Sequence, residues 1–374
     1  MNIPFSFLDK EKMVPIRATA TKTILSAAKS VLALSSFIGD RQLPRCSGFL
    51  IEWDAARKEG IVVTSADLIC SSKSMDDWSG KDVHCRNAKV YVHLLDNTTV
   101  EGCLIYFQTD YNLAFFKISV DQHLQLLHLL NQRLEYAQAV FLLGRDESLY
   151  LGIGHGRVLC CDPNLANRHH YMNVDGTAPE CVTGGPAIDY NGEVVGMASL
   201  YARQAIIPSF IIFKCWHFWK RFNCIPRPHL GLKFSSIKFR SVPQIDKISR
   251  DCKIEDGLIV QEVSEESIAE GLGVRIGDIV TSFNGECISD TVELESMLLS
   301  MSEAHFDQGN RLNSKMNVNI GVFHMSNRAQ RDISLSVNVS DKGEVVLRRS
   351  YLVNPPSGQE LPVPPCRVQR WLCY

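Results

Sequence analysis

The sequence lacks the signatures of several protein classes. It has no CxxC pair, and its 13 cysteines are odd in number and irregularly spaced, so reduced thiols are expected rather than a disulfide framework or a zinc site. Lysine and arginine are scattered along a chain of net charge -2, which offers no basic surface to nucleic acid or to anionic lipid. We therefore expect no metal, no cofactor and no nucleic-acid partner.

Long apolar runs are also missing. The opening MNIPFSFLDKEK has acidic residues early and no apolar core, so no signal peptide is predicted and an intracellular location, cytoplasmic or nuclear, is expected. The most apolar later stretch, 206–222, is interrupted by Lys214, His217 and Lys220, and the rest falls short of the ~20 residues of a membrane span. This stretch predicts a buried amphipathic helix instead.

The chain does have the composition of a folded protein with more than one core. Its 374 residues exceed a typical domain of about 100–200, and 45% of them are hydrophobic. Short β-type runs separated by turns fill residues 46–205, including a hairpin with a four-residue loop between 90–95 and 100–107. They predict an all-β barrel or sandwich, closed by a helix with Ser209 as its N-cap.

The amino-acid pattern changes after residues 224–229, where two prolines in three residues predict a linker. Four strand-like runs between residues 230 and 339 are mixed with two expected helices. Ser264 is the candidate cap of the first helix, and Asp290 opens the second with a capping-box spacing to Glu293. Strands around two helices predict a small α+β unit.

Motifs along both units resemble the Deg/HtrA family. IVVTSADLI (61–69) resembles the segment that presents the catalytic histidine, DYNLAFFKI (110–118) the segment that supplies the aspartate, and CVTGGPAID (181–189) the nucleophile loop. RPHLGL (227–232) resembles the start of a PDZ domain. The resemblance implies a mainly β chain, with a trypsin-like double β-barrel followed by a small α+β PDZ-like domain. The expected parts are a trypsin-like domain at 1–225, a PDZ-like domain at 226–340 and an extended, poorly packed, proline-rich tail at 341–374.

Every catalytic position departs from the family pattern. The resemblance assigns Asp67 to the position of the general base, Asn112 to that of the orienting acid and Thr183 to that of the nucleophile. Cys181 stands where a glycine usually helps to form the oxyanion hole, while Gly184 matches the family loop. A carboxyl group of pKa near 3.9 is a poor base at neutral pH, Asn carries no charge, and the methyl group of Thr restricts its side chain. No functional catalytic residue is therefore expected.

Two functions stay open. The first is a non-catalytic homologue of the Deg/HtrA serine proteases that binds peptides or proteins, or regulates them, through its PDZ-like domain. The alternative is a weak or unconventional endopeptidase with Thr183 or Cys181 as its nucleophile. His169 and His170 lie on a polar stretch and are predicted to form a solvated turn rather than to supply a base or a metal ligand.

The segment Leu230-Gly231-Leu232 is the candidate peptide-binding loop. The resemblance implies that its backbone amides face the C-terminal carboxylate of a peptide, which adds as a strand beside the following sheet edge. Expected partners are peptides or proteins with hydrophobic C-termini, and homo- or hetero-oligomers with Deg-type relatives. The chain's own end, Leu372-Cys373-Tyr374, is a candidate occupant of the groove. A domain that only packs against the barrel stays open as the alternative.

Overall fold

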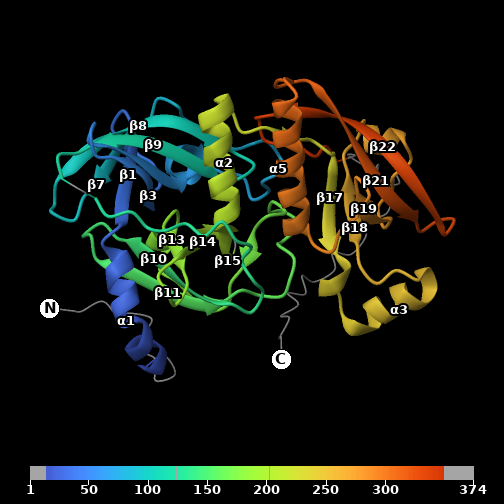
Figure 1. The fold of residues 1–374 in the computed structure, drawn as a ribbon, viewed down its shortest axis with the longest axis horizontal. Helices are drawn as coiled ribbons and strands as arrows, with labels where there is room; N and C mark the ends of the chain where they lie inside the picture. The colour runs from blue at the N-terminus through green and yellow to red at the C-terminus, as the bar shows by residue number, and fades with distance from the viewer. Residues whose placement is uncertain (1–13, 123, 202, 349–374) are drawn as a thin grey trace, which may run out of the picture.

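The computed structural model describes residues 14–122, 124–201 and 203–348. It contains three larger sheets and a small hairpin, divided between a barrel unit, made of one closed barrel and one half-barrel, and a smaller α+β unit (Figure 1). The predicted fold class is confirmed. Within the described residues, no helix combines the length and the apolar character needed to cross a membrane.

The first sheet closes into a barrel because its two ends meet. Its order is β2-β1-β3-β4-β9-β8-β7, and β1 also pairs with β7. The small hairpin β5–β6 and the 3-10 turn η3 lie beside it. The elements are β1 (Val31–Ile38), β2 (Arg41–Gln42), β3 (Cys46–Asp54), β4 (Glu59–Ser65), η3 (Ala66–Ile69), β5 (Cys70–Ser72), β6 (Val83–His84), β7 (Lys89–His93), β8 (Thr99–Gln108) and β9 (Leu113–Ser119).

The second sheet stays open, in the order β11-β10-β13-β14-β15-β12. Two helices flank it, and the apolar face of the second is buried as predicted. Ser209 is the first helical residue rather than its cap, because its hydroxyl donates to the carbonyl of Leu130 at 2.5 Å. The elements are α1 (Val14–Ala28), β10 (Ala139–Arg145), β11 (Leu151–Arg157), β12 (Met172–Asn173), η4 (Glu180–Val182), β13 (Pro186–Ile188), β14 (Val194–Tyr201), β15 (Arg203–Pro208) and α2 (Ser209–Phe222).

The third sheet forms the α+β unit, in the order β16-β22-β21-β19-β18-β17, with β20 paired to β19. Among the described residues, strand β17 therefore has a sheet neighbour on one side only. The elements are β16 (Arg227–Pro228), β17 (Leu232–Ser236), η5 (Ile237–Phe239), α3 (Val242–Cys252), β18 (Leu258–Val263), α4 (Ile268–Gly271), β19 (Ile279–Phe283), β20 (Glu286–Cys287), α5 (Thr291–Asp307), β21 (Lys315–His324) and β22 (Ala329–Ser340).

The structure differs from the sequence-based expectations for this unit in three details. The unit has a third helix, α3, which was not predicted because none of its residues is buried and its signal is only a capping box between Ser241 and Gln244. The cap of α4 is Ser267 instead of Ser264. Residues Arg227–Pro228 form an edge strand within the expected linker, which suits a proline that cannot donate to a ladder. The predicted cap of α5 is confirmed, since Asp290 Oδ1 accepts from the Glu293 amide at 2.7 Å.

The two units are docked through α2 and α5, which lie side by side (Figure 1). Lys214 on α2 pairs with Glu303 on α5 at 2.9 Å, and the rings of Phe222 and Phe306 are 5.1 Å apart. The expectation of a poorly packed tail was wrong for its first eight residues, since 341–348 runs between the units with Glu344 and Val346 buried. Its remainder, 349–374, lies outside the described residues.

Candidate active-site cleft and peptide-binding loop

Asp67, which the resemblance assigns to the position of the general base, is bound to a lysine. It lies in η3 directly after β4, where the Ser65 hydroxyl caps the turn by accepting from the Asp67 amide at 3.1 Å. Lys73 Nζ donates to both carboxylate oxygens, at 2.6 and 2.7 Å. The two side chains are only 17% and 22% exposed, so this ion pair is partly shielded from water. A carboxylate held in this way has little freedom to take a proton from a hydroxyl.

Asn112 lies beside this pair in the turn before β9. Its Nδ2 donates to Asp67 Oδ2 at 3.4 Å, and its Oδ1 accepts from the Ser65 hydroxyl at 3.3 Å. The backbone of Asn112 has φ 47°, a left-handed conformation that Asn adopts more readily than most residues. The fold thus brings the two positions together, but as a neutral amide donating to an anion rather than as an anion orienting a base.

Thr183 follows the 3-10 turn η4, and its amide is used within that turn. The Thr183 N–H donates to the Glu180 carbonyl at 3.2 Å, and the Thr183 carbonyl accepts from the Ser47 amide at 2.7 Å. In the serine protease template the nucleophile's own amide is one of the two oxyanion donors. Here that donor is directed at a carbonyl of the same chain.

Gly184 is required for the shape of this loop. It has φ +81°, and a Cβ at this residue would lie 2.4 Å from the Ser47 carbonyl oxygen and 2.6 Å from Thr64 Oγ1. The Ser47 hydroxyl also donates to the Cys181 carbonyl at 2.6 Å. Ser47, which sequence reasoning did not single out, therefore ties the nucleophile loop to β3.

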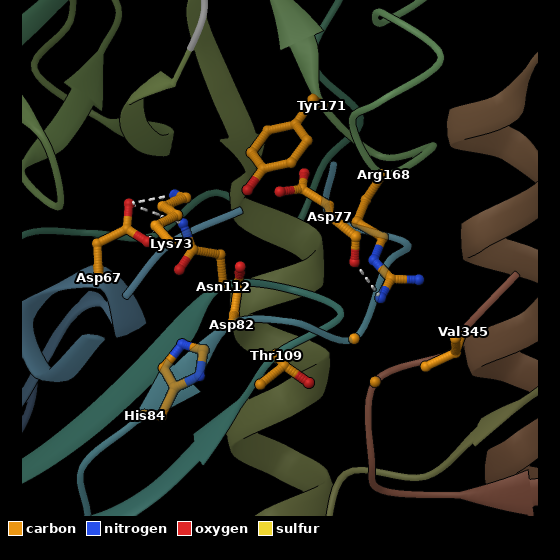
Figure 2. A pocket seen from close by; sticks show the side chains of 12 residues that line it. Asp67, Lys73, Asp77, Asp82, His84, Thr109, Asn112, Arg168, Tyr171 and Val345 are labelled. Atoms are coloured by element: carbon orange, nitrogen blue, oxygen red, sulfur yellow. Dashed lines mark hydrogen bonds and ion pairs between the residues drawn. The ribbon is translucent and has the colours of Figure 1, made fainter. Parts of the chain in front are cut away.

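Two cavities meet at the Asp67–Lys73 pair. One, of about 430 Å³, is lined by Asp67, Lys73 and Thr183, so the residues that the resemblance assigns to the base and the nucleophile share one cleft. The other, of about 180 Å³, is lined by Asp67, Lys73, Asn112 and Asp77 (Figure 2). Burial raises the pKa of Asp77 to about 6, and the tail residues Gly343 and Val345 complete the wall of this second cavity.

Cys181 does not line the cavity that Asp67 and Thr183 line. It lines the adjoining cavity, of about 720 Å³, with Arg145, and the two cavities share Glu180 and Cys46 in their walls. Its sulfur packs against β11, since a Cβ at Gly152 would lie 2.4 Å from Cys181 Sγ. Burial raises the pKa of the Cys181 thiol to about 11, and the charge of Asp146 acts in the same direction. The thiol is therefore protonated at neutral pH and a poor nucleophile.

The predicted solvated turn at His169 and His170 was wrong, because both side chains are buried between the two units, at 3% and 1% exposure. His169 Nε2 accepts from the Phe234 amide at 3.0 Å, and its ring is 4.8 Å from that of Trp78. Burial lowers the pKa of His170 to about 3 and also lowers that of His169. Because the residues around His169 and His170 are polar, the burial of the two rings could not be predicted from the sequence.

In the candidate peptide-binding loop, Leu230 and Leu232 are core residues, at 3% and 1% exposure. Gly231 has φ +70°, a backbone conformation that glycine adopts without strain. Its amide donates to Glu344 Oε1 at 2.6 Å. The loop is therefore formed, and its glycine amide binds a carboxylate from the chain's own tail.

Arg227 joins this carboxylate to helix α5. It is 2% exposed, pairs with the other oxygen of Glu344, and contacts Glu295 Oε1 at 2.7 Å. Burial alone would lower the pKa of Arg227, but the charges of Glu295 and Glu344 outweigh it and raise that pKa. The sequence analysis assigned no role to these three side chains, although Arg227 opens the RPHLGL motif, because they are far apart in the chain.

The geometry agrees with comparisons to known proteins. The trypsin-like peptidase domain family matches residues 46–197, and the PDZ domain family matches residues 259–306. The chain is 25% identical over 262 residues to the Arabidopsis thaliana "Putative protease Do-like 14", covering 66% of this chain and 58% of that one. It is 23% identical over 297 residues to the Mus musculus "Serine protease HTRA4", covering 75% of this chain and 57% of that one.

Solved structures show the same fold. The structure titled "HtrA-type protease AlgW with tripeptide" has a TM-score of 0.59 at 15% identity, over 86% of this chain and 97% of that one. The serine endoprotease from Yersinia pestis has a TM-score of 0.51 at 15% identity, over 90% and 99%. The protein therefore has the architecture of a trypsin-like domain followed by a PDZ domain.

With the sequence relatives, this places the chain as a Deg/HtrA-like protein. It spans somewhat over half the length of the first two relatives, 58% and 57%.

Proposed function

We propose that the protein is a non-catalytic Deg/HtrA homologue that binds peptides or proteins through its PDZ domain. The observation that carries the proposal is the ion pair at the base position, where Lys73 holds both oxygens of Asp67 at 2.6 and 2.7 Å. Acyl transfer by a hydroxyl needs a base of near-neutral pKa that can reach the hydroxyl and an anion that steadies the base. Asp67 and Asn112 supply neither.

The nucleophile loop supports the same proposal. The Thr183 amide donates to Glu180 within η4, so binding an oxyanion would require this turn to unwind. Loss of one triad member in a comparable enzyme lowers the rate by roughly 10⁴- to 10⁶-fold, and the members act as a unit. Replacement of all three leaves no route to efficient turnover.

The test is a sensitive activity measurement on the pure protein. Unfolded casein and a fluorophosphonate probe are incubated with the wild type, with Thr183→Ala and with Cys181→Ala, beside active trypsin. No turnover and no labelling are expected from any form. Casein turnover that Thr183→Ala abolishes would contradict the proposal and favour the endopeptidase alternative. Turnover lost only in Cys181→Ala, and kept in a control at the exposed Cys103, would identify a cysteine nucleophile.

The ligand class follows from the PDZ domain. We propose peptides or proteins with hydrophobic C-termini, whose carboxylate would be recognised by the Gly231 amide and Arg227. We further propose that the protein associates with Deg-type relatives, that it is intracellular, and that its domain boundaries lie at residues 225 and 340. Size-exclusion chromatography with light scattering measures the association directly.

A further inference from the structure

The ligand-facing side of β17 is occupied by groups of the chain itself. Within the part of the chain that the structure describes, β17 pairs with β18 alone, so its alternate amides point to the other edge, where an added peptide strand would bind. The Phe234 amide donates to His169 Nε2 at 3.0 Å, and the Ser236 amide donates to Asp162 Oδ2 at 2.8 Å. Both acceptors belong to the barrel unit.

The carboxylate loop next to this edge is occupied as well. Glu344 Oε1 accepts from the Gly231 amide at 2.6 Å, and Oε2 pairs with Arg227. The Glu344 side chain thus presents both oxygens of a carboxylate to an amide and a guanidinium, as a peptide's C-terminal carboxylate would. It is 1% exposed, so an incoming carboxylate cannot reach the loop while Glu344 stays in place.

We propose that Glu344 is an intramolecular ligand of the PDZ carboxylate loop, and that the free C-terminal carboxylate of a peptide enters the loop only by displacing it. Pairing of the rest of the peptide along β17 would also require the Phe234 and Ser236 amides to leave His169 and Asp162. This inference rests on the proposed peptide-binding function. The expectation that the end of the chain, 372–374, fills the groove stays a prediction, since those residues lie outside the described part.

The segment around Glu344 is anchored on both units. The Val346 amide donates to the Trp78 carbonyl at 3.1 Å in the barrel unit. The Leu347 amide donates to Ser264 Oγ at 3.0 Å, and the Leu347 carbonyl accepts from the Glu265 amide at 2.9 Å. Glu344 lies four residues after the end of β22, so its tether is short. A short tether gives an effective concentration in the millimolar range or above, which a peptide must overcome.

Displacement of Glu344 is chemically feasible. Arg227 keeps its contacts with Glu295 when Glu344 leaves, so its charge is not left unpaired, and the incoming carboxylate replaces the outgoing one. The neighbours of Glu344, Gly343 and Val345, line the cavity beside Asp67. Moving the segment would therefore also open that cavity, which links the PDZ loop to the cleft of the trypsin-like domain.

The test uses the full-length chain and two readouts. The first is hydrogen–deuterium exchange of residues 229–237, which needs no ligand. The second is binding of a fluorescein-labelled pool of octapeptides ending in Val, Leu or Phe, with a C-terminally amidated pool as the probe for carboxylate recognition. The variants are Glu344→Ala and Glu344→Gln, and the matched control is Asp341→Asn, a tail carboxylate that accepts from Tyr106 Oη of the barrel unit at 3.0 Å.

Glu344→Ala is expected to speed exchange in 229–237 and to tighten binding of the free-carboxylate pool at least about 10-fold, because the competing ligand is gone. Asp341→Asn should behave as the wild type. Wild-type affinity and wild-type exchange in both Glu344 variants would overturn the inference. If Glu344→Ala loses its fold, judged by circular dichroism, Glu344→Gln decides, since it keeps the shape and loses the charge. Faster exchange with no peptide binding to any form would leave the Glu344 contact standing and refute the proposed peptide binding.

Discussion

Arg227 and Glu295 form a buried, two-point ion pair between the first strand of the PDZ sheet and helix α5. Arg227 Nη2 lies 2.7 Å from Glu295 Oε1, and Nε donates to Oε2 at 3.1 Å, with both side chains 2% exposed. Since Glu295 also accepts from Tyr111 of the barrel unit at 3.3 Å, the pair belongs to the junction of the two units as well as to the PDZ core.

Removing the guanidinium of Arg227 should lower the stability of the protein. Arg227→Met leaves the buried carboxylates of Glu295 and Glu344 without their partner, so the free energy of unfolding should fall by about 3–5 kcal/mol. Urea denaturation measures the change. Arg221→Met is the control, because Arg221 makes partly exposed pairs with Glu303 and Asp307 and its loss should cost about 0–1 kcal/mol. Equal losses of unfolding free energy in the two variants would contradict the expectation that the buried ion pair stabilises the protein more than the exposed pairs.

Restoring the nucleophile alone should not restore reactivity. In Thr183→Ser the hydroxyl still has no base, and the amide of residue 183 still bonds to the Glu180 carbonyl. Fluorophosphonate labelling should stay at the level of the wild type. Adding Asp67→His and Asn112→Asp should also leave the protein inert, because these changes leave the η4 turn intact. Labelling of the single variant at the rate of trypsin would refute this account of the cleft.

Mild acid should destabilise the junction of the two units. Burial lowers the pKa of His170 to about 3 from 6.5, so the unfolded chain binds a proton that the folded chain excludes. This stability is therefore fully present above pH 6.5 and is lost as the pH falls from there toward 3. Between pH 7 and pH 5 the loss from His170 alone is about 2 kcal/mol.

The measurement is urea unfolding at both pH values for the wild type and for His170→Phe, which should lose most of the pH dependence. The ring of His170 packs on Tyr111 and Tyr171, at 5.2 and 4.7 Å, so Phe fits the surroundings. The charged groups that act on His170 are Glu295, Arg168, Arg227 and Asp110. An unchanged pH dependence in His170→Phe would assign the effect to other groups.

The nucleophile loop should tolerate no side chain at Gly184. Gly184→Ala combines a left-handed backbone with a contact of 2.4 Å to the Ser47 carbonyl. Gly273→Ala separates the two effects, because Gly273 has φ +92° and open space around it. We expect the control to lose about 1–2 kcal/mol from the backbone alone, and Gly184→Ala to lose about 1–3 kcal/mol more. Thermal unfolding compares them, and equal losses would mean that the loop can shift to make room.

Local patterns determined much of this protein. The alternation of apolar residues and the turn residues predicted the barrel strands, and the spacing from Asp290 to Glu293 predicted the start of α5. The resemblance assigned Asp67 and Asn112 to two positions of one site, and in the structure Asn112 Nδ2 lies 3.4 Å from Asp67 Oδ2. These features depend on neighbours in the chain or on a sheet topology shared with relatives, so they can be read from the residues alone.

Tertiary structure alone decided what these residues contact. His169 lies on a polar stretch, yet docking of the two units buries it against Phe234. Glu344 lies in a tail that composition predicts to be unpacked, yet it reaches Gly231, 113 residues away. Such contacts form because burying one charged or polar group requires a partner of matching chemistry, and only the folded chain determines which distant partner is within reach.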